Sequence, residues 1–228
     1  MTYPYDIRSE FYTFETDRCG NNGIGLAIYY PEKITDKAKI AVIAMHASSY
    51  MGFTPMVNMA RCGYIAAGIS AKGRRVEDLM HAMNLAINFV KEHTPAEKVV
   101  LMAHSQGGCA LTCYQYIAEN GTERFDTSGR FIPFPEIEKL TPADGMLVLD
   151  GNYGIMSMLA LDPAVRVMNN GYSRIPGLDI FNPENGYRPG GSVYTEDFIR
   201  DFQKAQVQEY RELFAYCQYR YDAIRAGR

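Results

Sequence analysis

No uninterrupted apolar run in the sequence approaches the roughly 18 residues that cross a membrane, so we expect no membrane span. The N-terminus has no apolar stretch after its start, and we therefore expect no cleaved secretion signal. Charges nearly balance, with 23 Lys and Arg residues against 26 Asp and Glu residues, and no basic stripe indicates binding to nucleic acid. Tryptophan is absent, but 47% of the residues are hydrophobic, which is enough for a sizeable core.

Cysteine is scarce and scattered. The five cysteines form no Cys-x-x-Cys pair, so we predict neither a disulfide framework nor a zinc ribbon, and a reducing cytoplasmic location is favoured. Cys109 and Cys113 lie four residues apart in a predicted helix, a spacing that a metal site can use, but they lack the further ligands. We interpret both as buried small side chains, and we expect neither a metal nor another cofactor.

The first 150 of the 228 residues alternate between short apolar runs and helical patterns. The runs predict strands over residues 8–16, 24–30, 40–45, 64–69, 98–103 and 145–150. Helical spacing predicts helices over residues 54–63, with Thr54 as N-cap, 76–93 and 106–119. Such alternation predicts an α/β fold, with a mostly parallel sheet and helices on both of its faces. We therefore assign residues 1–150 to the core of the protein.

The composition changes after Asp150. Residues 151–194 are rich in Gly, Pro, Asn and Tyr, which predicts an irregular, lid-like insertion rather than more sheet. Residues 195–226 then predict one long helix with Thr195 as its N-cap and an apolar stripe that packs against another element. We therefore assign residues 151–228 to a second part of the chain, a lid-like insertion that ends in a long helix.

One motif indicates chemistry. The predicted strand at 98–103 runs into the predicted helix at 106–119 through His104-Ser105-Gln106-Gly107. A serine between small residues in such a turn resembles the nucleophile elbow of the α/β-hydrolase superfamily, written G-x-S-x-G, with Ala103 in place of the first glycine. The other interpretation is a tight strand-to-helix turn without catalytic chemistry.

The resemblance implies roles for individual residues. Ser105 would be the nucleophile, and the backbone N–H of Gln106 would supply one half of the oxyanion hole. In this superfamily the loop after the third strand supplies the other half, often next to a His-Gly pair. Here that strand is followed by His46-Ala47-Ser48, so the N–H of Ala47, or of Ser48, would take this place.

A catalytic histidine is missing from the expected place. The superfamily's chain order is Ser, then Asp or Glu, then His, yet all four histidines precede the serine: His46, His81, His93 and His104. Asp150 ends a strand where some members carry the triad acid, although a turn residue before Gly151 explains it equally simply. We interpret His46 as a positioning or packing residue and His104 as an inward-facing one.

The last strands of the superfamily's fold have no counterpart in this sequence. The strand at 145–150 would then be an apolar edge without the charges or proline that protect such edges. We therefore expect a C-terminal partner segment, or self-association, to cover it. That segment would also bring the catalytic histidine.

Together these features predict a serine hydrolase of the esterase or lipase kind, with a small acyl or ester substrate. A catalytically silent binding or assembly module on the same fold is the alternative, because the triad is incomplete in these residues. Other chemistry on this fold, such as a transferase or a lyase, is a third interpretation, since a fold does not determine a reaction.

Overall fold

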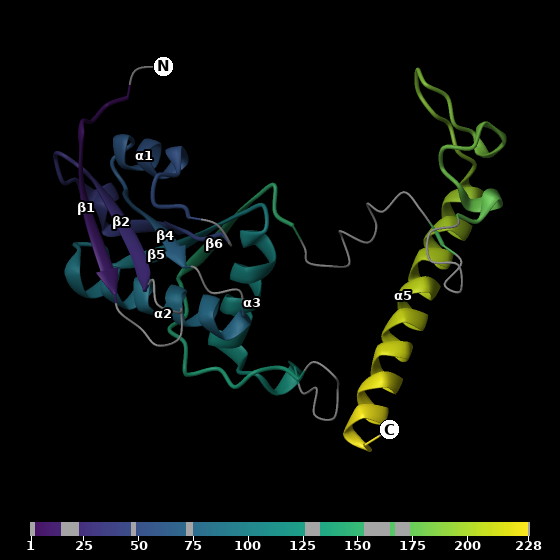
Figure 1. The fold of residues 1–228 in the computed structure, drawn as a ribbon. Coiled ribbons are helices and arrows are strands. Elements are labelled where there is room, and N and C mark those ends of the chain that lie inside the picture. The colour runs from purple at the N-terminus through teal and green to yellow at the C-terminus, as the bar shows by residue number, and fades with distance from the viewer. Residues whose placement is uncertain are drawn as a thin grey trace. The chain divides into compact units, whose positions relative to one another are not determined.

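The computed structural model describes residues 3–14, 23–46, 49–71, 75–125, 133–152, 165–166 and 174–227. The chain divides into two compact units, one formed by Met1–Asp126 with Phe134–Gly154 and the other by Thr127–Pro133 with Ile155–Arg228. The first unit contains a sheet with its helices, and the second contains one long helix (Figure 1). No helix within the described ranges is long and apolar enough to cross a membrane.

The sheet of the first unit has six strands in the order β1-β2-β4-β3-β5-β6. Their bounds are β1 (Ile7–Phe14), β2 (Ile24–Pro31), β3 (Ile40–Ala44), β4 (Ile65–Ala71), β5 (Lys98–His104) and β6 (Gly145–Leu149). The β1–β2 and β2–β4 pairs are antiparallel, and the β4–β3, β3–β5 and β5–β6 pairs are parallel. The predicted α/β class with a mostly parallel sheet is confirmed. Within the described residues β6 ends the sheet and pairs with β5 alone.

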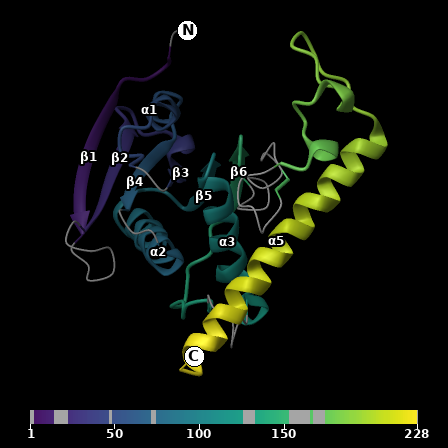
Figure 2. The ribbon, with the colours of Figure 1, turned by 45° about the vertical axis from the view of Figure 1, so that its right-hand side comes forward.

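Helices cover both faces of this sheet. The helices of the first unit are α1 (Thr54–Arg61), α2 (Val76–His93) and α3 (Gly107–Asn120), with short 3₁₀ helices η2 (Asp36–Lys39) and η3 (Glu123–Phe125). In Figure 1, α1 lies above the sheet, while α2 and α3 lie below it; Figure 2 shows the same layers turned. Val42 and Met102 pack with Met56 of α1 on one face. Their strand neighbours Ile43 and Leu101 pack on the other face, in the core that the sheet forms with α2 and α3. Burial on both faces explains why these strands are continuously apolar.

Two predicted helix starts differ from the structure by one residue. Phe53, not Thr54, is the N-cap of α1, because the amide of Met56 donates to the carbonyl of Phe53 at 2.9 Å. Similarly, α3 begins at Gly107, with Gln106 as its N-cap. Neither helix start uses a side-chain cap, so the residue types that mark a cap in sequence gave no guide there.

Among its described residues, the second unit contains α5 (Glu196–Arg225), preceded by the 3₁₀ helices η5 (Pro176–Leu178) and η6 (Pro183–Asn185). The predicted N-cap is confirmed, since the Thr195 side chain accepts a 3.2 Å hydrogen bond from the amide of Phe198. Two members of the predicted apolar stripe near the end of α5 have exposed side chains, Leu213 at 39% and Ile224 at 66%. That the stripe packs against another element stays a prediction.

Candidate active site

Ser105 occupies a tight turn between β5 and α3. Its φ of 50° lies in the left-handed region, which residues with a side chain rarely adopt. Its carbonyl oxygen accepts hydrogen bonds from the amides of Gly108 (2.9 Å) and Asn152 (2.7 Å). Its own amide donates to the carbonyl of Leu149 at 3.3 Å. The neighbouring backbone therefore maintains a conformation that is unfavourable by itself.

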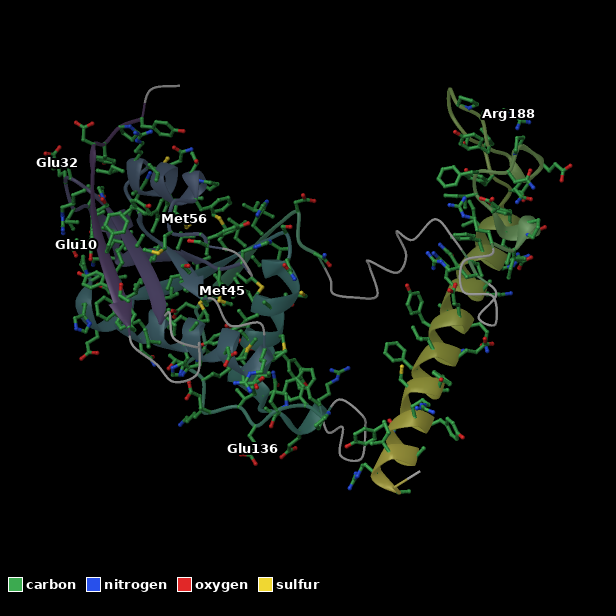
Figure 3. The ribbon with its side chains drawn as sticks, viewed as in Figure 1. Glu10, Glu32, Met45, Met56, Glu136 and Arg188 are labelled. Atoms are coloured by element: carbon green, nitrogen blue, oxygen red, sulfur yellow. The ribbon has the colours of Figure 1, made fainter. Side chains whose placement is uncertain are left out.

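Close backbone contacts explain the small residues that follow Ser105. A Cβ on Gly107 would overlap the carbonyl oxygen of Met45, an interior residue at the end of β3 (Figure 3). A Cβ on Gly108 would lie 2.8 Å from the Cα of Gly151 and 2.9 Å from the backbone nitrogen of Asn152. The first turn of α3 therefore fits between the ends of β3 and β6 only with glycine at both positions.

The N-terminus of α3 lies directly behind Ser105. Gln106 precedes the helix and is exposed. Within the described part of the chain, its amide donates to no acceptor, and the Ser105 hydroxyl has no hydrogen-bond partner. Free amides at a helix N-terminus favour negative charge. This arrangement can stabilise an anion that develops beside Ser105.

Of the other predicted site residues Ala47, Ser48 and Asp150, the structure describes Asp150. Ala47 and Ser48, the predicted second half of the oxyanion hole, lie outside the described residues. Asp150 lies in the turn after β6, is exposed, and has a φ of 47°. The flanking residues Leu149 and Asn152 both bond to the Ser105 backbone, so Asp150 belongs to the turn that borders Ser105. Asp tolerates the left-handed region better than most residues, which accounts for its presence in this turn.

Four rings form a cluster at the end of β5, which we call the ring cluster: His46, Tyr50, Phe53 and His104. Tyr50 stacks on His46 (centroids 5.0 Å apart, 7° between planes) and on Phe53 (4.1 Å, 22°). The Tyr50 hydroxyl and His104 Nδ1 share a 2.5 Å hydrogen bond. His104 is half-buried and bonds to Tyr50, which packs in the core on the α1 face of the sheet.

Burial shifts the pKa of two members of the ring cluster, and both shifts favour the neutral form. Burial, and then the nearby His104 ring, lowers the pKa of His46. Burial raises the pKa of Tyr50 above its usual value near 10. The imidazole of His46 and the phenol of Tyr50 are therefore both neutral at pH 7.

The other two histidines lie on α2 and contact residues outside the ring cluster. His81 Nδ1 lies 2.8 Å from a carboxylate oxygen of Glu138, and His93 stacks on Phe89 with ring centroids 4.2 Å apart. Neither contact involves the Ser105 turn. Tyr50 is the residue that sequence reasoning missed, because nothing in the sequence links a tyrosine in a loop to a histidine 54 positions later.

No set of three or more His, Cys, Asp or Glu residues able to hold a metal occurs in the described ranges. The thiols of Cys62, Cys109, Cys113 and Cys217 are free. Burial, followed by the nearby Cys109, raises the pKa of the Cys113 thiol, so Cys113 is not an activated nucleophile.

No protein-family model matches the chain, and no curated protein matches it. Similar solved structures include esterase B from Lactobacillus rhamnosis, at 15% identity and a TM-score of 0.44, covering 64% of this chain and 49% of that one. Brefeldin A esterase, a bacterial homologue of human hormone sensitive lipase, has 18% identity and a TM-score of 0.41, covering 52% of this chain and 37% of that one. Vibralactone cyclase has 14% identity and a TM-score of 0.43, covering 88% of this chain and 54% of that one.

The chain thus spans between 37% and 54% of the length of these three structures. The strand order and the two helical layers define the fold of this chain, and the geometry around Ser105 defines the candidate site.

Proposed function

We propose that this chain carries the nucleophile of a serine hydrolase that acts on a carboxylic ester or a related acyl compound. The observation that carries the proposal is the left-handed backbone of Ser105, with φ of 50°, between β5 and the N-terminus of α3. A serine in a strained strand–turn–helix connection presents its hydroxyl at the C-terminal end of its strand, as a nucleophile elbow requires. Ser105 Oγ would attack the substrate carbonyl and form an acyl-enzyme.

The tetrahedral intermediate would place its oxyanion at the N-terminus of α3. The amide of Gln106, which donates to no acceptor among the described residues, supports this role. The amide of Ala47, or of Ser48, would be the second donor, as the resemblance implies. Together with the dipole of α3, these donors would stabilise charge that appears only during the reaction.

A general base is still needed, because a serine hydroxyl is a weak nucleophile when it is neutral. No histidine follows Ser105 in the sequence. We propose that the base comes from outside these residues, on a C-terminal partner segment or on another copy of the chain. Exposed apolar side chains on β6, Val148 at 41% and Leu149 at 38%, support pairing along that edge. Asp150 is our candidate for the triad acid, and the cytoplasm is our proposed location.

The second candidate function is a catalytically silent binding or assembly module. It starts from the same observation, that no histidine follows Ser105 in the given residues, and from the principle that a fold does not determine a reaction.

A fluorophosphonate probe separates the two functions, because it reacts with activated serines. The sample is the protein with any polypeptide that co-purifies, and we expect the probe to label it. The control Ser9→Ala, on an exposed face of β1, should be labelled to the same extent. Ser105→Ala should not be labelled. Absence of labelling in all three proteins would support the silent module, and equal labelling of Ser105→Ala would exclude Ser105 as the nucleophile.

A further inference from the structure

We propose that Tyr50 and His104 form a positioning pair that fixes the Ser105 turn against the loop after β3. This inference rests on the proposed function, because it assigns the pair a role in orienting Ser105. Neither residue is a candidate nucleophile or base in this proposal. The role of the pair is to hold the end of β5.

The position of His104 is the first argument. His104 is the last residue of β5 and is joined directly to Ser105. A residue with a left-handed backbone costs about 1–3 kcal/mol and persists only where its surroundings restrain it. On the β6 side, Leu149 and Asn152 provide hydrogen bonds to the Ser105 backbone. On the α1 side, the hydrogen bond between the Tyr50 hydroxyl and His104 Nδ1 is the restraint.

The fixed position of Tyr50 is the second argument. Its amide donates to the carbonyl of Ile69 in β4 at 2.9 Å, and its carbonyl accepts from the amide of Phe53 at 3.1 Å. Its carbonyl also lies where a Cβ on Gly68 would be, so the loop lies directly against β4. Tyr50 is only 8% exposed. The backbone of Tyr50 is therefore held in place, and its hydroxyl can orient His104.

The third argument is that Tyr50 contacts both predicted catalytic segments. Its ring stacks on His46, which precedes Ala47, and its hydroxyl bonds to His104, which precedes Ser105. Displacing either histidine relative to Tyr50 would change the separation between the nucleophile and the loop after β3. Errors of about 1 Å in such placement can cost about 100-fold in rate.

The chemistry of the pair supports positioning rather than simple packing. Burying a hydroxyl and an imidazole costs free energy, because both groups lose hydrogen bonds to water. Two apolar side chains of similar shape would not have this cost. Their net contribution to stability is therefore modest, whereas the direction of their hydrogen bond is specific. Because burial raises the pKa of Tyr50, its phenol keeps the proton that this hydrogen bond needs.

Two measurements test the pair. The first is hydrogen exchange of the backbone amides in the peptide at 103–109. The second is labelling by the fluorophosphonate probe, from which the inactivation rate at saturating probe and the half-saturation concentration are determined separately. In Tyr50→Phe, which keeps the ring stack, we expect about fivefold faster exchange, from loss of one hydrogen bond. The saturated rate should fall about tenfold, with the half-saturation concentration within about twofold. Tyr12→Phe, which removes a hydroxyl bonded to Glu10 on β1, is the matched control and should change neither quantity.

Substitutions of His104 complete the test. His104→Leu should behave like Tyr50→Phe, and the double variant should lose no more than either single variant, because both remove one interaction. His104→Asn should keep most of the rate, since its carboxamide oxygen can replace Nδ1 as acceptor. Losses that multiply in the double variant, or unchanged exchange and rate in Tyr50→Phe, would overturn the pair.

The outcomes separate this inference from the proposed function. If the unsubstituted protein is never labelled while Tyr50→Phe still exchanges faster at 103–109, the proposed function fails and the pair stands as the restraint on the turn. If exchange rises but the labelling rate stays the same, the proposed function survives and the positioning role is overturned.

Discussion

The carbonyl oxygen of Ser105 accepts a 2.7 Å hydrogen bond from the amide of Asn152, which lies beyond the end of β6. The amide of Ser105 donates in turn to Leu149, the last residue of β6. The turn that carries the candidate nucleophile is thus bonded through its backbone to the next strand of the sheet. Any change that separates α3 from the end of β6 should therefore also release Ser105.

Gly108→Ala should cause such a separation. The added Cβ would meet only backbone atoms, the Cα of Gly151 at 2.8 Å and the nitrogen and oxygen of Asn152 at 2.9 Å, and backbone cannot yield as a flexible side chain does. We expect a loss of about 1–3 kcal/mol in the free energy of unfolding, measured by urea denaturation. Gly52→Ala, where nothing lies within 4 Å of the new Cβ, should change it by less than about 0.5 kcal/mol. Equal stability of the two variants would show that the contact at Gly108 is loose.

The sequence predicted the β5–Ser105–α3 connection because all of its signals are local. An apolar run, a serine between small residues and a helical pattern occur within about 20 residues of each other. The strand order was not predicted, because pairing of β2 with β4 depends on contacts between residues 37 to 47 positions apart in the sequence, and such contacts leave no periodic signal. The bond between Tyr50 and His104 was missed for the same reason.

His46 should make the protein less stable in mild acid. Its folded pKa is lowered by burial and by His104, so the unfolded chain binds this proton more readily than the folded chain. The free energy of unfolding should begin to fall as the pH drops through about 6.5, the unfolded pKa of histidine, and should level off below the lower folded pKa. His46→Gln should show a smaller fall between pH 7.5 and 5.5.

His93→Gln is the control for this pH dependence, since His93 stacks on Phe89 at the end of α2, away from the ring cluster. Its free energy of unfolding should fall more between pH 7.5 and 5.5 than that of His46→Gln. If His46→Gln and His93→Gln follow the same curve, the environment of His46 does not favour its neutral form.

Asp150→Asn tests the candidate acid. Asn tolerates the left-handed backbone as well as Asp does, so the melting temperature should stay unchanged. If the carboxylate orients and stabilises the catalytic histidine, hydrolysis should fall about 10⁴-fold, as for a triad acid replaced by its amide. Hydrolysis at the unsubstituted rate would leave Asp150 as a turn residue only.

Val148→Lys tests the edge of the sheet. Val148 is 41% exposed on β6, and a lysine on an edge strand opposes pairing with another chain. We expect the chain without a partner segment to self-associate in analytical ultracentrifugation, and Val148→Lys to shift it toward monomer. Phe11→Lys, on the opposite edge strand β1 where Phe11 is 64% exposed, should leave association unchanged. The proposed pairing edge is wrong if only Phe11→Lys reduces association.

The central claim is that Ser105 is the nucleophile, and the turnover number for hydrolysis of a small aryl ester tests it most directly. The assay should use the protein with any polypeptide that co-purifies. The comparison is with Ser105→Ala protein that is folded to the same extent. Loss of a triad nucleophile costs about 10⁶ in kcat, so we predict that Ser105→Ala falls to the background rate. Retention of more than a few per cent of the turnover number by Ser105→Ala would contradict the account.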